Sequence, residues 1–320
     1  MKSKKCSSWE PPSFFTMPED LLEKSDLIQH YLKKNHECLS PFSFVNLFAW
    51  KDFFSFDLKV IDDALCIFAK DVSGTFMYLP PLGETVTSKT IAACFEHMRA
   101  VNGRSRVARI ENVSPKSISL FPDEKYASYH KGYEYIYFKN DIVQLKGNDF
   151  KSKRSDYNFF TNTYVAKISP FSPAMIEECL TLYDHWACQR KALNLEVVYQ
   201  QMLEDSRRVH ETVLKHAKEL NVLGLVVEVD GAIKAYSVGY EINPDVFCIL
   251  FEIADLSYKG LPVFIFRNFA KDQRLQTYKF LNAMDDFGLE NARVTKMSFR
   301  PAVLSPMYSV KEREKNPRLL

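Results

Sequence analysis

Glycine is scarce in this chain of 320 residues, and no two of its ten glycines are closer than Gly224 and Gly231. The phosphate-binding motifs G-x-G-x-x-G and G-x-x-x-x-G-K-[ST] are therefore both missing. Close approach of the backbone to a phosphate generally needs such glycines, because they carry no side chain. The sequence thus lacks the usual signal for Rossmann and P-loop sites, and it disfavours a glycine-rich loop for acetyl-CoA.

Cysteine motifs, metal motifs and long apolar segments are missing as well. The seven cysteines are scattered and include no C-x-x-C pair, so we expect reduced thiols rather than a disulfide framework or a zinc ribbon. No H-x-x-x-H spacing occurs, and we expect no metal. No apolar run reaches 18 residues and no signal peptide is evident. We therefore expect a cytoplasmic protein without a membrane span, with a peripheral position at the inner membrane face left open.

The residues that are abundant indicate a well-packed globular protein. Hydrophobic residues make up 46% of the chain, with 25 Phe and 16 Tyr, and aromatic side chains bury large areas. The length favours two domains of roughly 150 residues each. The formal net charge of +2 argues for neither nucleic acid nor membrane, and DNA is not indicated. Any phosphate binding must therefore come from a local basic patch.

The pattern along the chain predicts two similar units. We expect a flexible arm over residues 1–17, a first unit over 18–160, a second over 161–310 and a charged tail over 311–320. Thr87 is a candidate cap for a helix with an apolar face of Ile91, Cys94, Phe95 and Met98. Asp230-Gly231 is the strongest hairpin signal in the chain. Strand-like runs are also predicted at 117–121 and at 298–299. This mixture of strands and helices predicts a tandem pair of α/β (α+β) domains.

An acidic cluster follows the strand predicted at residues 278–281. Asn282, Asp285 and Asp286 come directly after it, and Glu252 and Asp255 lie at the end of another predicted strand. Polar groups at strand ends in α/β proteins usually face a crevice. These carboxylates would hold an ammonium group through charge-assisted hydrogen bonds. The ordinary alternative is that they are solvated turn residues.

Two basic clusters accompany the acidic one. The first would contact phosphates or the acceptor end of a tRNA, or else is a solvent-exposed helix start; it comprises Lys146, Lys151, Lys153 and Arg154. The second contains Arg293, Lys296 and Arg300. Lys296 would polarise a reacting carbonyl, or else is a surface lysine or a salt-bridge partner.

Three ordered groups of segments in this sequence resemble a known family. They are residues 44–50 (FVNLFAW) with 79–83 (LPPLG), residues 134–137 (EYIY) with 145–154 (LKGNDFKSKR), and residues 251–255 (FEIAD) with 282–288 (NAMDDFG) and 296–301 (KMSFRP). The chain resembles, over about residues 40–310, the C-terminal domain of phosphatidylglycerol lysyltransferases and its free-standing relatives. The resemblance implies two tandem GNAT-like domains, with mixed and mostly antiparallel sheets flanked by helices. It also implies transfer of an aminoacyl group from aminoacyl-tRNA to a lipid or peptide, without a cofactor.

The resemblance suggests a role for each candidate. Glu252 and Asp286 would bind the amine, Asn282 would orient the carbonyl, and Lys296 would offset developing negative charge. Further substrate contacts are assigned to Asp255, Asp285, Arg293 and Glu196, the last of which occupies a family-like position at a helix start.

The sequence also departs from the family pattern. The family has a glutamate at the position of Met284 and often a lysine at that of Ile253. A non-catalytic module that binds tRNA, an anionic lipid head group or a protein therefore stays open. A CoA-dependent N-acyltransferase using residues 258–261 is the third alternative.

Overall fold

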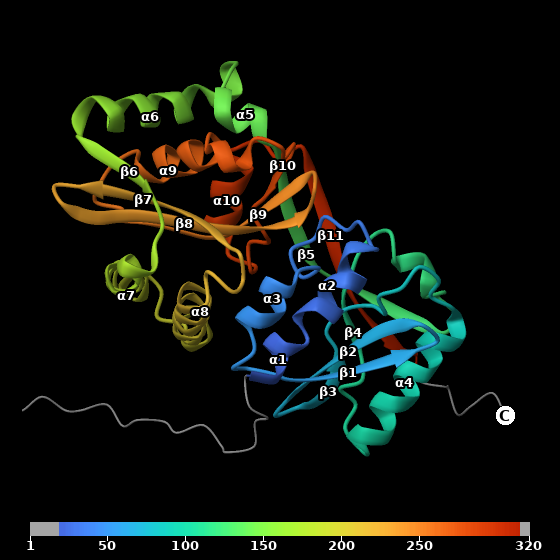
Figure 1. The fold of residues 1–320 in the computed structure, drawn as a ribbon. Coiled ribbons are helices and arrows are strands. Elements are labelled where there is room, and N and C mark those ends of the chain that lie inside the picture. The colour runs from blue at the N-terminus through green and yellow to red at the C-terminus, as the bar shows by residue number, and fades with distance from the viewer. Residues whose placement is uncertain (1–18, 314–320) are drawn as a thin grey trace, which may run out of the picture.

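The computed structural model describes residues 19–313, so the predicted arm and most of the predicted tail lie outside the described residues. Eleven strands form one sheet in the order β1-β2-β3-β4-β11-β5-β10-β9-β8-β7-β6 (Figure 1). Their bounds are β1 Ser55–Ile61, β2 Ala64–Asp71, β3 Gly74–Met77, β4 Ile110–Val113, β5 Tyr126–Phe138, β6 Ala166–Pro170, β7 Leu223–Val229, β8 Ala232–Asn243, β9 Val246–Ala254, β10 Phe280–Asn282 and β11 Val303–Glu312.

The helices lie on both faces of this sheet. Their bounds are α1 Glu19–Glu23, α2 Ser25–Lys33, α3 Phe44–Ala49, α4 Ser88–Asn102, α5 Lys139–Gln144, α6 Lys151–Thr163, α7 Ile176–Leu193, α8 Val197–Lys215, α9 Leu261–Ala270 and α10 Glu290–Met297. In the second half of the chain α9, with α6 above it, covers one face of β6–β9, while α7 and α8 cover the other (Figure 1). None of the helices within residues 19–313 is long and apolar enough to span a bilayer.

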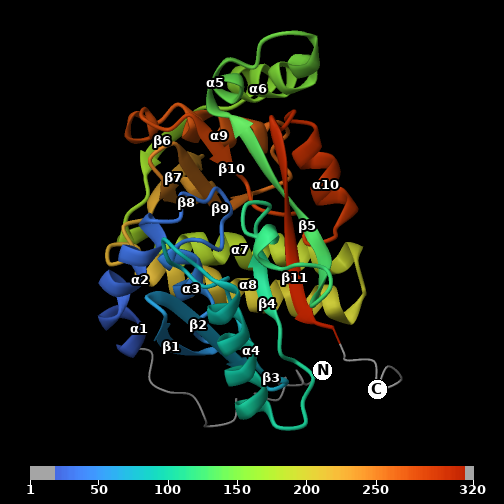
Figure 2. The same ribbon diagram turned by 90° about the vertical axis from the view of Figure 1, so that its right-hand side faces the viewer.

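Two strands exchange partners between the halves and join them. β5, from the first half, pairs antiparallel with β10 of the second half. β11, the last strand of the chain, returns to pair with β4 of the first half. β5 and β11 also pair with each other from Val303↔Ile136 to Glu312↔Tyr126, and they run side by side through the centre of the molecule (Figure 2). The centre of the sheet is therefore built from both halves.

Local sequence signals explain several of these elements. Thr87 and Thr90 form a reciprocal capping box at the start of α4, and the four predicted apolar positions of that helix are fully buried. Asp230 and Gly231 connect β7 to β8 with left-handed φ values of 53° and 77°, as a type I′ hairpin requires. Both of these predictions are confirmed.

Other predictions need correction. Residues Ile118–Leu120 form a 3-10 turn instead of a strand, and residues 298–299 end α10. β11 extends to Glu312, so the predicted tail begins inside a strand. The predicted boundary at residue 160 falls within α6, where Phe160 packs on Phe264 of α9 with 4.5 Å between ring centroids. Packing thus places α6 with the second half of the chain.

Candidate functional site

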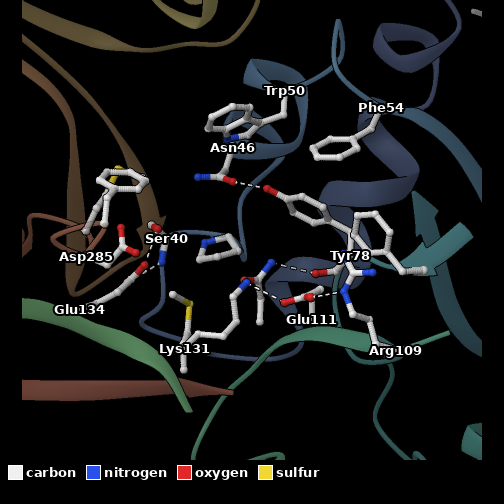
Figure 3. Close-up of a pocket in the computed structure, with 16 residues that line it drawn as sticks. Ser40, Asn46, Trp50, Phe54, Tyr78, Arg109, Glu111, Lys131, Glu134 and Asp285 are labelled. Atoms are coloured by element: carbon white, nitrogen blue, oxygen red, sulfur yellow. Dashed lines mark hydrogen bonds and ion pairs between the residues drawn. The ribbon is translucent and has the colours of Figure 1, made fainter. Parts of the chain in front are cut away.

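A pocket of about 300 Å³ lies where the two halves meet (Figure 3). The first half of the chain supplies most of its wall, and β11 and the loop after β10 supply the rest. It is lined by Ser40, Pro41, Asn46, Trp50, Phe54, Phe76, Tyr78, Arg109, Glu111, Asn112, Lys131, Glu134, Met284, Asp285, Phe287 and Met307. α3 positions two of these residues, and its start is fixed because the Ser43 hydroxyl accepts a hydrogen bond from the Val45 N–H at 3.1 Å.

One end of the pocket is acidic. Glu134 of β5 and Asp285 of the loop after β10 lie there beside Ser40 (Figure 3). Within residues 19–313, no basic nitrogen forms an ion pair with Asp285 at 4 Å or less. Burial raises the pKa of Asp285, and the nearby Lys296 ammonium partly offsets that effect. Asp285 is therefore a carboxylate that a bound cation would stabilise.

Glu134 is fully buried and organises its surroundings. Its Oε2 accepts hydrogen bonds from the Ser40 N–H at 2.8 Å and from the Asn282 side-chain amide at 2.5 Å. Its Oε1 accepts from the Ser40 hydroxyl at 2.5 Å. Burial raises the pKa of Glu134 to about 7, although these hydrogen bonds work in the opposite direction. Glu134 thus ties the segment before α3 to the end of β10.

Asn282 does not offer a donor to a substrate. It is fully buried, and its amide nitrogen donates to the Cys38 carbonyl at 2.7 Å and to Glu134 at 2.5 Å. Its side-chain oxygen accepts from the Met284 N–H at 2.7 Å. An asparagine amide has two N–H donors, and both are used here. The expectation that Asn282 orients a carbonyl is corrected: it positions the loop that carries Asp285.

Lys296 holds the same loop from α10. Its Nζ donates to the Ala283 carbonyl at 2.5 Å and also to the Asp285 carbonyl. Burial lowers the pKa of Lys296, while the carboxylates of Asp285, Glu134 and Asp286 act against that shift. An ammonium has three N–H donors, so one remains beyond these two carbonyls.

The loop after β10 has an unusual backbone. Met284 and Phe287, which both line the pocket, have left-handed φ values of 59° and 52°. A residue other than glycine pays about 1 kcal/mol or more for this conformation. The contacts of Asn282 and Lys296 supply the compensating interactions. Strain of this kind concentrates at binding and catalytic sites, which agrees with the position of the loop at the pocket.

Asp286 and Glu252 do not line this pocket. The Asp286 carboxylate accepts from the Tyr135 hydroxyl at 2.5 Å and from the Gly288 N–H at 2.9 Å. Glu252 of β9 has a buried Oε2 without a hydrogen-bond partner, and burial raises its pKa to about 8 although Lys296 opposes the shift. Lys296 thus acts electrostatically on Glu252 and on Asp285 alike, and the carboxylates that line the acidic end of the pocket are Glu134 and Asp285.

The buried Glu252 should make stability fall as pH rises. Its folded pKa of about 8 is above the ordinary value of 4.5. Between these two pH values the native state keeps a proton on Glu252 that the unfolded state has released, so the free energy of unfolding falls as pH rises. We expect Glu252→Gln to match wild type near pH 4.5 and to exceed it above pH 8 by up to about 5 kcal/mol. Urea unfolding across this pH range measures the difference. The exposed Glu219→Gln is the control, and a wild-type slope in Glu252→Gln would contradict the assignment.

Three further expected substrate residues lie outside the pocket lining. Asp255 accepts from the Ser257 N–H at 3.0 Å and hydroxyl at 2.6 Å, which fixes the turn after β9. Glu196 is the exposed N-cap residue of α8. Arg293 is exposed on α10 and lies 3.7 Å from Glu290. Asp255 does not contact a substrate in this pocket because its carboxylate holds the turn after β9.

The first basic cluster lies at the start of α6, on the α9 and α10 side of the sheet (Figure 1). Lys146 and Lys151 are exposed. Lys153 is half-buried with its Nζ 4.3 Å from the Phe299 ring centroid, and burial lowers its pKa. Arg154 donates to the carbonyls of Leu145 and Gly147. Of the four expected phosphate contacts, Arg154 therefore binds backbone carbonyls instead. Lys146 and Lys151 are the two whose side chains are exposed to solvent, where a polyanion would bind.

The pocket wall from the first half was not foreseen as part of the site. Lys131 lies 2.7 Å from Glu111 and donates to Asn112 at 3.0 Å. Arg109 also pairs with Glu111 and stacks 4.2 Å from the Phe76 ring centroid. Burial would raise the pKa of Glu111, but the two cations hold it below its ordinary value. The sequence held two clues to this region, the family-like segments 44–50 and 134–137, which carry the lining residues Asn46, Trp50 and Glu134.

Comparisons with known proteins agree with this architecture. A solved conserved protein of unknown function from Bacteroides thetaiotaomicron VPI-5482 has 25% identity and a TM-score of 0.81, over 91% of this chain and 97% of that one. L-PGS from Bacillus licheniformis has 18% identity and a TM-score of 0.62, over 91% and 93%. A tandem GNAT protein from the clavulanic acid biosynthesis pathway has 10% identity and a TM-score of 0.50, over 93% and 96%. The predicted tandem GNAT-like fold is confirmed.

Sequence comparison gives the family. No protein of curated function shows a significant match to the chain. Within the part of the chain that the structure describes, no group of three or more His, Cys, Asp or Glu residues is placed to hold a metal ion. The family model described as "Phosphatidylglycerol lysyltransferase, C-terminal" matches residues 36–311. With most of its length matched, and with the tandem fold just described, the chain belongs to the phosphatidylglycerol lysyltransferase C-terminal domain family.

Proposed function

We propose that this protein is an aminoacyltransferase that takes an aminoacyl group from aminoacyl-tRNA and passes it to a lipid or peptide acceptor. Family membership supports a transferase of the acyl or aminoacyl class. The single observation that carries the finer proposal is Asp285, a pocket carboxylate without an ion-pair partner among residues 19–313. An aminoacyl ester presents an α-ammonium beside its carbonyl, which is the group such a carboxylate binds.

The chemistry needs orientation more than an assigned base. With the α-ammonium at Asp285, the acceptor's nucleophilic nitrogen or oxygen attacks the ester carbonyl carbon. The new bond to the acceptor forms, the bond to the ribose oxygen breaks, and the acceptor's proton ends on that ribose oxygen. Fixing the ester in one geometry supplies much of the acceleration. The Lys296 ammonium, which holds the loop beside the pocket without lining it, would stabilise through space the negative charge that develops on the carbonyl oxygen.

The start of α9 weighs against CoA as the donor. Gly260 caps this helix, and a Cβ at its position would lie 2.1 Å from the Asp156 carbonyl of α6. The Leu261 N–H already donates to the Tyr258 carbonyl at 3.1 Å, and Pro262 has no N–H. A pyrophosphate at a helix N-terminus depends on free N–H groups. Here α6 packs against the place where it would bind, so we infer that acetyl-CoA is not the donor.

The exposed lysines at the start of α6 should contact the tRNA backbone. Arg300 lies 3.6 Å from Asp149 and Lys153 lies over Phe299, so this segment adjoins α10 and its Lys296. We expect Lys146→Glu with Lys151→Glu to weaken tRNA binding at least tenfold and to reduce the salt dependence by about two phosphate contacts. Filter binding at several salt concentrations measures both. Lys218→Glu, an exposed change in the turn after α8, is the control, and an equal loss there would contradict a specific RNA surface.

The direct test of the function is transfer of label. The protein is incubated with tRNA charged with a radioactive amino acid, together with either membrane lipids or short peptides with free amines. We expect label to move into the lipid or peptide fraction, and not from uncharged tRNA mixed with free amino acid. Absence of transfer, with no tighter binding of charged than uncharged tRNA, would contradict the proposal and favour a non-catalytic binding module.

A further inference from the structure

Three carboxylates and two cations line the pocket, which leaves one negative charge in excess. Arg109 and Lys131 share Glu111. Glu134 accepts three hydrogen bonds, two from Ser40 and one from Asn282. Asp285 remains as the pocket carboxylate without an ion pair among the described residues. The pocket is therefore prepared for one positive charge on its ligand.

The far end of the pocket is aromatic. Phe54 meets Phe76 edge to face with 5.6 Å between ring centroids, and Phe54 lies 6.4 Å from Tyr78. Trp50 completes this wall, and the Tyr78 hydroxyl is already donated to the Asn46 side chain at 2.6 Å. Figure 3 shows Asp285 and Glu134 at one end, with Phe54, Tyr78 and Arg109 at the other. A ligand held at Asp285 would thus extend its remaining bulk toward apolar rings and two cations.

We propose that the aminoacyl group carried to this pocket has a bulky apolar or aromatic side chain, and that lysyl and arginyl groups are disfavoured. This inference rests on the proposed function. An α-ammonium satisfies Asp285, and an apolar side chain gains from burial against the aromatic wall. A second cation would meet Arg109 and Lys131 instead of a free carboxylate, and an unpaired buried charge is strongly unfavourable.

Met284 offers a sharp test because it lines the pocket beside Asp285. Met284→Glu would add a second carboxylate without changing side-chain length much. Its backbone N–H would still donate to Asn282, and neither residue is β-branched, so the left-handed φ of 59° is equally tolerated. Met284→Gln has the same shape without charge and serves as the matched control.

The experiment uses one tRNA transcript charged by an aminoacylating ribozyme with phenylalanine, leucine or lysine. Affinity for the full-length protein is measured by competition filter binding. We expect the phenylalanyl and leucyl forms to bind at least about tenfold more tightly than the lysyl form, within the range by which apolar pockets discriminate. Met284→Glu should remove or reverse that preference, and Met284→Gln should preserve it.

Each outcome bears on a different statement. Lysyl-tRNA bound as tightly as phenylalanyl-tRNA by the wild-type protein would overturn this inference and leave the proposed transferase intact. Charged forms that bind no better than the uncharged transcript would overturn the proposed function as well. A second measurement compares L-phenylalaninamide, L-alaninamide and L-lysinamide by calorimetry. Equal affinities of the phenylalanine and alanine amides would mean that the aromatic wall does not bind the aminoacyl side chain and contacts the acceptor instead. That result would also overturn the inference.

Discussion

Asp285→Asn is expected to slow aminoacyl transfer by at least about a hundredfold, because it removes the charge that would hold the α-ammonium. Stability should change little or rise slightly, since burial raises the pKa of Asp285 and its charged form is disfavoured in the free protein. Single-turnover transfer from charged tRNA measures the rate, and urea unfolding measures the stability. A large loss of rate without a loss of stability would identify a group that acts on the substrate.

Asp286→Asn is the matched control for this experiment. Asp286 is the adjacent carboxylate, but it accepts hydrogen bonds from Tyr135 and Gly288 and does not line the pocket. We expect its replacement to affect the rate far less than that of Asp285. If Asp285→Asn transfers at the wild-type rate and Asp286→Asn is much slower, the ammonium binds at Asp286 instead, next to Tyr135.

Only part of the acidic end of the site, Asp285, could be predicted, because its signal is local; Glu134, Glu252 and Asp286 were not predicted correctly. A β-prone run that ends in Asn282, Asp285 and Asp286 places polar groups at a strand end, and the structure puts Asp285 in the pocket. The aromatic half could not be predicted. Its residues reach the pocket because β5 pairs with β10 and β11 pairs with β4, and local periodicity contains no information on which distant strands pair.

Asn282 and Lys296 illustrate a second limit. Their types and positions indicated a role at the site, and both hold the loop that carries Asp285, although neither lines the pocket. The sequence does not reveal whether their donors are already used by neighbouring carbonyls. In the structure both donors of Asn282 are used, and so are two of the three on Lys296. Hydrogen-bond satisfaction is a property of packing, so Asn282 shapes the site where a substrate contact was expected.

The same network leads to the largest expected loss of stability. Glu134→Ala would leave the Ser40 N–H, the Ser40 hydroxyl and one N–H of Asn282 without their acceptor. Unsatisfied buried donors cost about 1–3 kcal/mol each, and water entering the vacated space would recover part of that. We therefore expect a loss of about 3 kcal/mol in the free energy of unfolding, measured by urea denaturation at pH 7.

Glu134→Gln keeps the volume and one acceptor oxygen, so it separates hydrogen bonding from packing. Its amide oxygen would take the place of Oε2 and accept from the Ser40 N–H and Asn282, while its amide nitrogen would donate to the Ser40 hydroxyl and keep a second N–H without a partner. We expect an intermediate loss of about 1–2 kcal/mol, the cost of one unmatched buried donor. Glu134→Ala with wild-type stability would mean that the network does not hold the segment before α3 to the end of β10. The geometry of the acidic end would then depend on the contacts of Lys296 with the carbonyls of Ala283 and Asp285 and on the bond between Asn282 and the Met284 N–H.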